Sequence, residues 1–147
     1  MRKVKKKFIG LKEADSAKNI LPERLKKASE GLYYVSETDA EIIPFVGQKA
    51  ESVSKEEILR QTNNSFDIPV EERSFADIFE RLTKIQDWHG EEEIAAAKKF
   101  AALKNLLESN LKDLKVYKIG KIELDIYFVG LNAEKILMGI KTRAVET

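Results

Sequence analysis

The sequence contains no cysteine and only one histidine, His89. Without cysteine there is no disulfide bond, catalytic thiolate, zinc ribbon or iron–sulfur cluster. A single histidine cannot by itself build a histidine-based metal centre. The seven glycines are scattered and form no glycine-rich phosphate-binding loop, and no serine stands in a nucleophile-elbow sequence. These absences exclude thiol chemistry and metal centres built on cysteine or histidine, and they leave no motif for phosphate binding or a serine nucleophile.

Long apolar runs are also absent. No stretch approaches the roughly 20 residues of a membrane-spanning helix. The lysine-rich start is followed only by Phe8–Leu11, which is too short for the apolar region of a signal peptide. We therefore expect a cytoplasmic protein without a membrane partner. Its 147 residues suit one domain, and the 43% hydrophobic content is enough for a buried core.

The net charge of +1 conceals an uneven distribution. Residues 1–12 carry six basic groups and no acid, whereas the other 135 residues hold 20 basic and 25 acidic groups, a net of −5. We predict a flexible basic arm over residues 1–13 and a single domain over residues 14–147. Such an arm can contact phosphates, but short basic termini often only improve solubility, so nucleic acid is not the expected partner.

The spacing of apolar residues predicts both helices and strands. We expect helices over residues 21–30, 54–61, 74–82 and 91–114, and strands over residues 32–35, 42–46, 116–119, 122–129 and 136–145. Residues 36–39 are predicted to form a polar turn that ends the first strand. The predicted fold class is α/β, with an antiparallel sheet covered by helices in a layered arrangement.

Three polar groupings have simple structural explanations. Asp87 and His89 would need a distant serine to make a triad, and a lone histidine in a polar loop is usually solvated. Residues 91–93 are glutamates that complement the dipole at a helix start. Glu123 and Asp125 share one strand face, where we expect them opposite lysines on a solvated surface. We therefore expect no enzymatic activity, no cofactor and no metal site in this protein.

Trp88 is the only tryptophan and has two interpretations. It either fills a gap in the core beside the long helix or stands exposed as an anchor for a partner, because tryptophan is enriched at interface hot spots. The sequence pattern leaves both open. Since no catalytic apparatus is visible, a binding or inhibitory protein is favoured over an enzyme.

Five stretches, in matching order from about residue 20 to the end, together resemble the nuclease A inhibitors. That family comprises small cytosolic proteins that block a metal-dependent, sugar-non-specific endonuclease of DNA and RNA. The stretches are Leu25–Leu32, Ser36-Glu37-Thr38, Gln86-Asp87-Trp88, Ser109–Lys112 and Val116–Thr147.

The resemblance implies an α/β/α sandwich related to the pathogenesis-related-1 fold, and an inhibitor that plugs the nuclease cleft. It implies that Glu37, on the loop after the first strand, and Thr147, through its hydroxyl and terminal carboxylate, approach the Mg²⁺ of the partner. Gln86, Asp87 and Trp88 would supply further contacts. The inhibitor would hold no metal of its own.

Two functional hypotheses follow. In the first, the protein is a monomer when free and occludes the active-site cleft of a Mg²⁺-dependent non-specific endonuclease. The net charge of −5 over residues 13–147 suits steering toward a basic cleft. The alternative is a non-catalytic interaction domain, or a nucleic-acid-binding domain that uses the lysine-rich arm.

Overall fold

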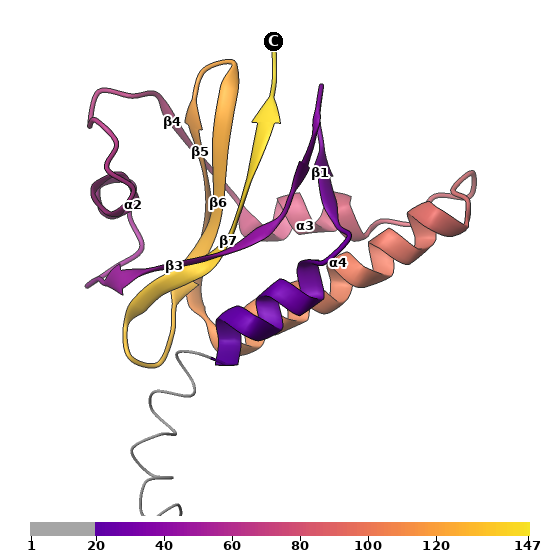
Figure 1. The fold of residues 1–147 in the computed structure, drawn as a ribbon, viewed down its shortest axis with the longest axis horizontal. Coiled ribbons are helices and arrows are strands. Elements are labelled where there is room, and N and C mark those ends of the chain that lie inside the picture. The colour runs from indigo at the N-terminus through magenta and orange to yellow at the C-terminus, as the bar shows by residue number, and fades with distance from the viewer. Residues whose placement is uncertain (1–19) are drawn as a thin grey trace, which may run out of the picture.

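The computed structural model describes residues 20–147, which form a mixed α/β fold (Figure 1). The predicted basic arm lies outside these residues. A helix over residues 20–29 comes first and carries no label in the figure. The elements that follow are β1 (Tyr33–Val35), β2 (Asp39–Glu41), β3 (Ile43–Lys49), α2 (Lys55–Gln61), β4 (Val70–Arg73), α3 (Phe75–Thr83), α4 (Glu91–Asn110), β5 (Lys112–Gly120), β6 (Glu123–Leu131) and β7 (Ile136–Val145).

The main sheet has the strand order β3-β7-β6-β5-β4, and every neighbouring pair is antiparallel. β5, β6 and β7 follow one another as hairpins, with Tyr127 of β6 opposite Tyr117 of β5 and Lys141 of β7. β1 and β2 form a separate two-stranded antiparallel ribbon. The structure thus confirms the predicted antiparallel sheet.

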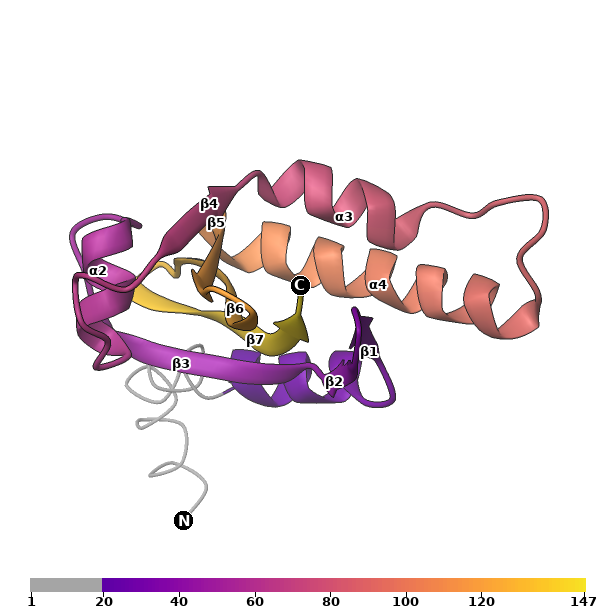
Figure 2. The ribbon, with the colours of Figure 1, turned by 90° about the horizontal axis from the view of Figure 1, so that it is seen from above.

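The two faces of the sheet bury separate apolar clusters. Ile126 and Phe128 of β6 pack on one face with the helix over residues 20–29, α3 and α4. Tyr127 and Val129, which point the other way because side chains alternate along a strand, pack on the second face with α2. Figure 2 shows α2 standing apart from the other three helices. The predicted cover of helices is therefore confirmed, while the relation to the pathogenesis-related-1 fold stays a prediction.

Phe79 lies at the centre of the larger cluster and is fully buried. Its ring centroid lies 4.7 Å from that of Phe75, 6.4 Å from that of Phe100 and 5.5 Å from that of Phe128. These aromatic contacts join α3 to α4 and to β6, and so fix α3 against the sheet.

Serine side chains cap the starts of α2 and α3. The Ser54 hydroxyl accepts a hydrogen bond from the Glu57 N–H at 3.1 Å at the start of α2, and the Ser74 hydroxyl accepts one from the Asp77 N–H at 3.2 Å at the start of α3. The three glutamates 91–93 occupy the first turn of α4, as predicted.

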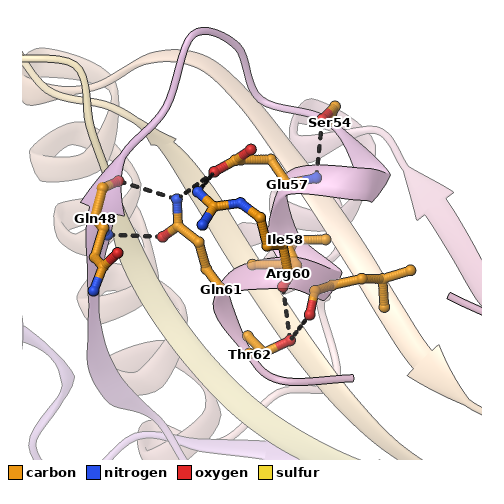
Figure 3. A network of polar contacts seen from close by, with 8 residues as sticks. Gln48, Ser54, Glu57, Ile58, Arg60, Gln61 and Thr62 are labelled. Atoms are coloured by element: carbon orange, nitrogen blue, oxygen red, sulfur yellow. Dashed lines mark hydrogen bonds and ion pairs between the residues drawn. The ribbon is translucent and has the colours of Figure 1, made fainter. Parts of the chain in front are cut away.

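Helix α2 is joined to strand β3 through the side chain of Gln61 (Figure 3). The Gln61 amide donates to the Gln48 carbonyl at 3.1 Å and accepts from the Gln48 N–H at 2.7 Å. The register between β3 and β7 shifts between Val46 and Lys49. The Gln61 side chain thus supplies hydrogen-bond partners to the main-chain N–H and carbonyl of Gln48 where the pairing of β3 is irregular, and it holds α2 against the sheet.

The long helix ends earlier than the sequence indicates. α4 stops at Asn110, whereas its apolar spacing predicts an end at residue 114. Leu111 is extended and Lys112 already pairs with Leu131 of β6, so Leu114 belongs to β5. The spacing of leucines continues across the boundary, but the pairing of β5 with β6 ends the helix.

Two short strands were not predicted. β4 pairs only with β5 and is mostly exposed and charged, so it carries no apolar alternation. β2 begins at Asp39, which the sequence assigns to a polar turn. Both strands owe their conformation to pairing with a neighbour rather than to burial.

The placement predicted for Asp125 is wrong. Asp125 lies opposite Ile119 in the β5–β6 hairpin and opposite Arg143 of β7, and its carboxylate is 3.2 Å from the Arg143 Nε. Glu123 lies opposite Val145. The Asp125 carboxylate is therefore paired with Arg143 of β7 and not with a lysine of β5.

Candidate functional site

The turn between β1 and β2 (residues 36–38) lies beside the C-terminal end of β7, as Figures 1 and 2 both show. The Val145 N–H donates to the Ser36 hydroxyl at 3.0 Å, and the Glu37 N–H donates to the Val145 carbonyl at 3.2 Å. Ser36 and Val145 are 109 residues apart in the sequence. These two hydrogen bonds place the turn against the last residues of the chain.

Ser36 also shapes the turn itself. Its hydroxyl donates to the Thr38 carbonyl at 3.0 Å, and its N–H donates to the same carbonyl at 2.9 Å. One hydroxyl therefore donates within the turn and accepts from Val145 of β7. These hydrogen bonds fix the main chain on both sides of Glu37, the middle residue of the turn.

Glu37 and Thr147 meet at this point. One carboxylate oxygen of Glu37, Oε2, accepts two hydrogen bonds from Thr147: one from the main-chain N–H and one from the hydroxyl, both at 2.7 Å. Both residues are exposed. We call this arrangement the Glu37–Thr147 pair. The two residues that the resemblance implies for the partner's metal thus lie together in the free protein.

These hydrogen bonds favour the ionised form of Glu37. The Thr147 hydroxyl, and then the Thr147 N–H, hold the pKa of the Glu37 carboxyl below its usual value because both stabilise the ionised form. At neutral pH the pair therefore presents a carboxylate to solvent.

A second contact restrains the segment that leads to Thr147. The Lys118 Nζ lies 3.0 Å and 3.3 Å from the two carboxylate oxygens of Glu146, and the Glu146 N–H donates to the Ile122 carbonyl at 2.9 Å. Lys118 is only 6% exposed. This ion pair was not predicted from the sequence, although a lysine two positions after Val116, on the same face of β5, was a possible signal.

These residues border a cleft of about 460 Å³. Arg81 and Leu82 of α3 contribute to its wall, together with residues of β1, the turn, β5 and the end of β7. The full lining consists of Tyr34, Val35, Ser36, Glu37, Arg81, Leu82, Lys118, Val145, Glu146 and Thr147. The Glu37–Thr147 pair thus belongs to a polar cleft at one end of the sheet.

The loop with Gln86, Asp87 and Trp88 does not line this cleft. It connects α3 to α4 at their outer ends, away from the C-terminus (Figure 2). Trp88 is 76% exposed, which decides against its placement in the core. His89 accepts a hydrogen bond through Nδ1 from the Gln86 N–H at 2.9 Å, so its ring closes the loop on itself.

The comparison with protein families identifies the chain. A family model described as nuclease A inhibitor-like protein matches residues 19–147. The chain belongs to the nuclease A inhibitor-like protein family. A search of curated proteins gave no match. The family assignment confirms the resemblance seen in the sequence, and the matched region begins after the basic segment at residues 1–12.

Membership in the nuclease A inhibitor-like family points to a nuclease-inhibitor role, a nuclease partner and a protein that is not an enzyme. Within residues 20–147, no group of three or more histidine or acidic side chains is placed to hold a metal ion. In the same part of the chain, no helix combines the length and apolar character needed to cross a membrane.

Proposed function

We propose that this protein inhibits a Mg²⁺-dependent, sugar-non-specific nuclease by occluding its active-site cleft, with Glu37 and Thr147 inserted toward the metal. The observation that carries the proposal is the pair of hydrogen bonds from Thr147 to one oxygen of the Glu37 carboxylate. They hold a carboxylate and a hydroxyl together, at an exposed position, before any partner is bound.

The chemistry of the pair suits such a target. Mg²⁺ is a hard cation that prefers oxygen ligands and usually leaves positions for substrate phosphates. An ionised carboxylate on a fixed turn can take the place of the scissile phosphate in a cleft built for a polyanion. Because Thr147 already orients the Glu37 side chain, this side chain loses little conformational entropy on binding, which favours affinity.

We assign a second, separate contact to the loop between α3 and α4. Trp88 is 76% exposed, and Gln86 and Asp87 stand beside it in the chain. Exposed tryptophans that become buried on binding are among the strongest interface residues. Because this loop lies away from the Glu37–Thr147 pair, it would contact the nuclease outside the active-site cleft.

The test compares two substitutions in the same ribbon. Glu37→Gln removes the proposed metal-directed charge, and Glu41→Gln removes an equal charge from exposed β2. Inhibition is measured as the rate of DNA cleavage by Mg²⁺-dependent non-specific nucleases of the same organism. We expect E37Q to weaken inhibition at least tenfold and E41Q to leave it within about twofold.

Two results would overturn the proposal. The first is a wild-type protein that inhibits none of these nucleases. The second is E37Q inhibition equal to that of the wild type. This result would be compatible with a nuclease-inhibitor role but would show that the Glu37–Thr147 pair is not needed for it.

A further inference from the structure

Lys118 is a buried charged side chain in the described part of the protein. It is 6% exposed, on the same face of β5 as the fully buried Val116. Removing an ammonium group from water costs free energy unless a partner of opposite charge compensates. The partner is Glu146, whose side chain is 42% exposed and which directly precedes Thr147.

The last three residues are held by different kinds of contact. Val145 pairs with Glu123 of β6 and with the turn at Ser36. Glu146 has one main-chain hydrogen bond, from its N–H to the Ile122 carbonyl, and the ion pair with Lys118. Thr147 has only its two hydrogen bonds to Glu37. The ion pair is therefore the last side-chain restraint before the Glu37–Thr147 pair.

We propose that Lys118 is a positioning residue for nuclease inhibition: its ion pair with Glu146 fixes the end of the chain so that Thr147 meets Glu37 before the nuclease binds. This inference rests on the proposed function. Lys118 acts through Glu146 and has no contact with the Glu37 carboxylate in the structure.

A purely structural role does not account for a lysine at this position. Replacing a buried ion pair with apolar side chains of similar size is often neutral or stabilising. Ile126, which lies opposite Lys118 in β6, and Val116 on the same face are both apolar and fully buried. An apolar residue at position 118 would continue this core, so the ion pair is best explained by what it does to Glu146.

The test is Lys118→Met, which keeps the length of the side chain and removes its charge. We expect the midpoint of urea unfolding to stay equal to or above that of the wild type, because the burial is retained without the cost of a buried charge. We expect inhibition to weaken about tenfold, the cost of ordering roughly one residue of backbone. Lys118→Arg, which can keep the ion pair, should restore inhibition to within about threefold.

Two further variants distinguish a change in the position of Thr147 from a change in the net charge of the protein. The double variant K118M/E146Q has the net charge of the wild type, so a loss of inhibition cannot come from altered long-range attraction. Lys115→Met is the matched control on the same strand, since Lys115 contacts the Val53 carbonyl at 3.1 Å and not the end of β7. We expect the double variant to resemble K118M and the control to resemble the wild type.

An NMR titration of Glu37 in the free protein measures the positioning of Thr147 without a nuclease. Loosening Thr147 in K118M should raise the pKa of Glu37 toward its ordinary value, because the hydrogen bonds that lower it are populated less. If E37Q loses inhibition while K118M inhibits like the wild type, the positioning role is refuted and the proposed function stands. If no nuclease is inhibited, an unchanged Glu37 pKa in K118M still refutes the positioning of Thr147.

Discussion

Replacing Phe79 with alanine tests how firmly α3 is attached to the fold. Phe79 is fully buried, and its ring contacts those of Phe75, Phe100 and Phe128. The substitution leaves a cavity where α3, α4 and β6 meet. Because Arg81 and Leu82 of α3 line the cleft beside Glu37, the attachment of this helix also supports the candidate site.

The expected loss of unfolding free energy follows from these contacts. Truncating a buried phenylalanine to alanine typically costs about 3–5 kcal/mol, a range that already includes the loss of its aromatic contacts. Since three ring contacts are removed together, we expect about 4 kcal/mol for Phe79→Ala. Domains of this size are stable by about 5–15 kcal/mol, so the variant should still fold at low temperature.

The assay is urea unfolding followed by circular dichroism. We expect a lower midpoint with an unchanged slope, because the surface exposed on unfolding stays nearly the same. Phe66→Ala is the matched control: Phe66 is 63% exposed, and its truncation should change stability by less than about 0.5 kcal/mol. A loss below about 2 kcal/mol for F79A would refute the reasoning, because it would show that α3 does not depend on this cluster.

Three other predictions concern single positions. Trp88→Ala should change the unfolding free energy by less than about 0.5 kcal/mol, since Trp88 is exposed. The same substitution should weaken nuclease binding at least tenfold in a titration. Binding equal to that of the wild type would show that the α3–α4 loop does not contact the nuclease. Gly139→Ala should destabilise the protein by about 3 kcal/mol, measured by thermal unfolding, because a Cβ there collides with the Phe128 carbonyl oxygen. Gly90→Ala, next to the flexible Glu93 side chain, is the control and should cost no more than about 1 kcal/mol, because alanine is only a poorer N-cap of α4 than glycine. The Glu37–Thr147 contact stabilises the fold above the ordinary pKa of a glutamate, because the folded pKa is lowered, and this contribution is lost as the pH falls through the folded pKa. An NMR titration should place the Glu37 midpoint below the ordinary value in the wild type and closer to it in Thr147→Val, which lacks the hydroxyl; equal midpoints would contradict the assignment.

Local signals predicted much of the fold. Ser54 and Ser74 mark the starts of α2 and α3 because each accepts a hydrogen bond within its own first turn. The alternation around Ile126 predicted β6 as well as its two antiparallel neighbours. The end of α4 was missed because it depends on the pairing of β5 with β6, which the apolar spacing of the helix does not reveal. The strand β4 was missed because it depends on pairing with β5, which is distant in the sequence.

The sequence predicted only part of the candidate site. Glu37 and Thr147 came from the family resemblance, since no spacing rule connects residues that are 110 positions apart. Ser36, Lys118 and Glu146 were missed because their roles arise from contacts between the β1–β2 turn, β5 and the end of β7. The basic arm, the cytoplasmic location and the monomeric state stay predictions.

The attachment of the β1–β2 ribbon has a consequence for heat resistance. The ribbon has only three paired positions of its own, and its turn is held to β7 by the hydrogen bonds of Ser36 and Glu37 with Val145. β6, in contrast, is paired along both edges. Local opening of the ribbon breaks the contacts of its turn with β7, the hydrogen bond from the Thr142 hydroxyl to the Glu41 carbonyl and the packing of Tyr34, and so requires less free energy than global unfolding. On warming, the Glu37–Thr147 pair would therefore separate reversibly while β5, β6 and β7 are still paired.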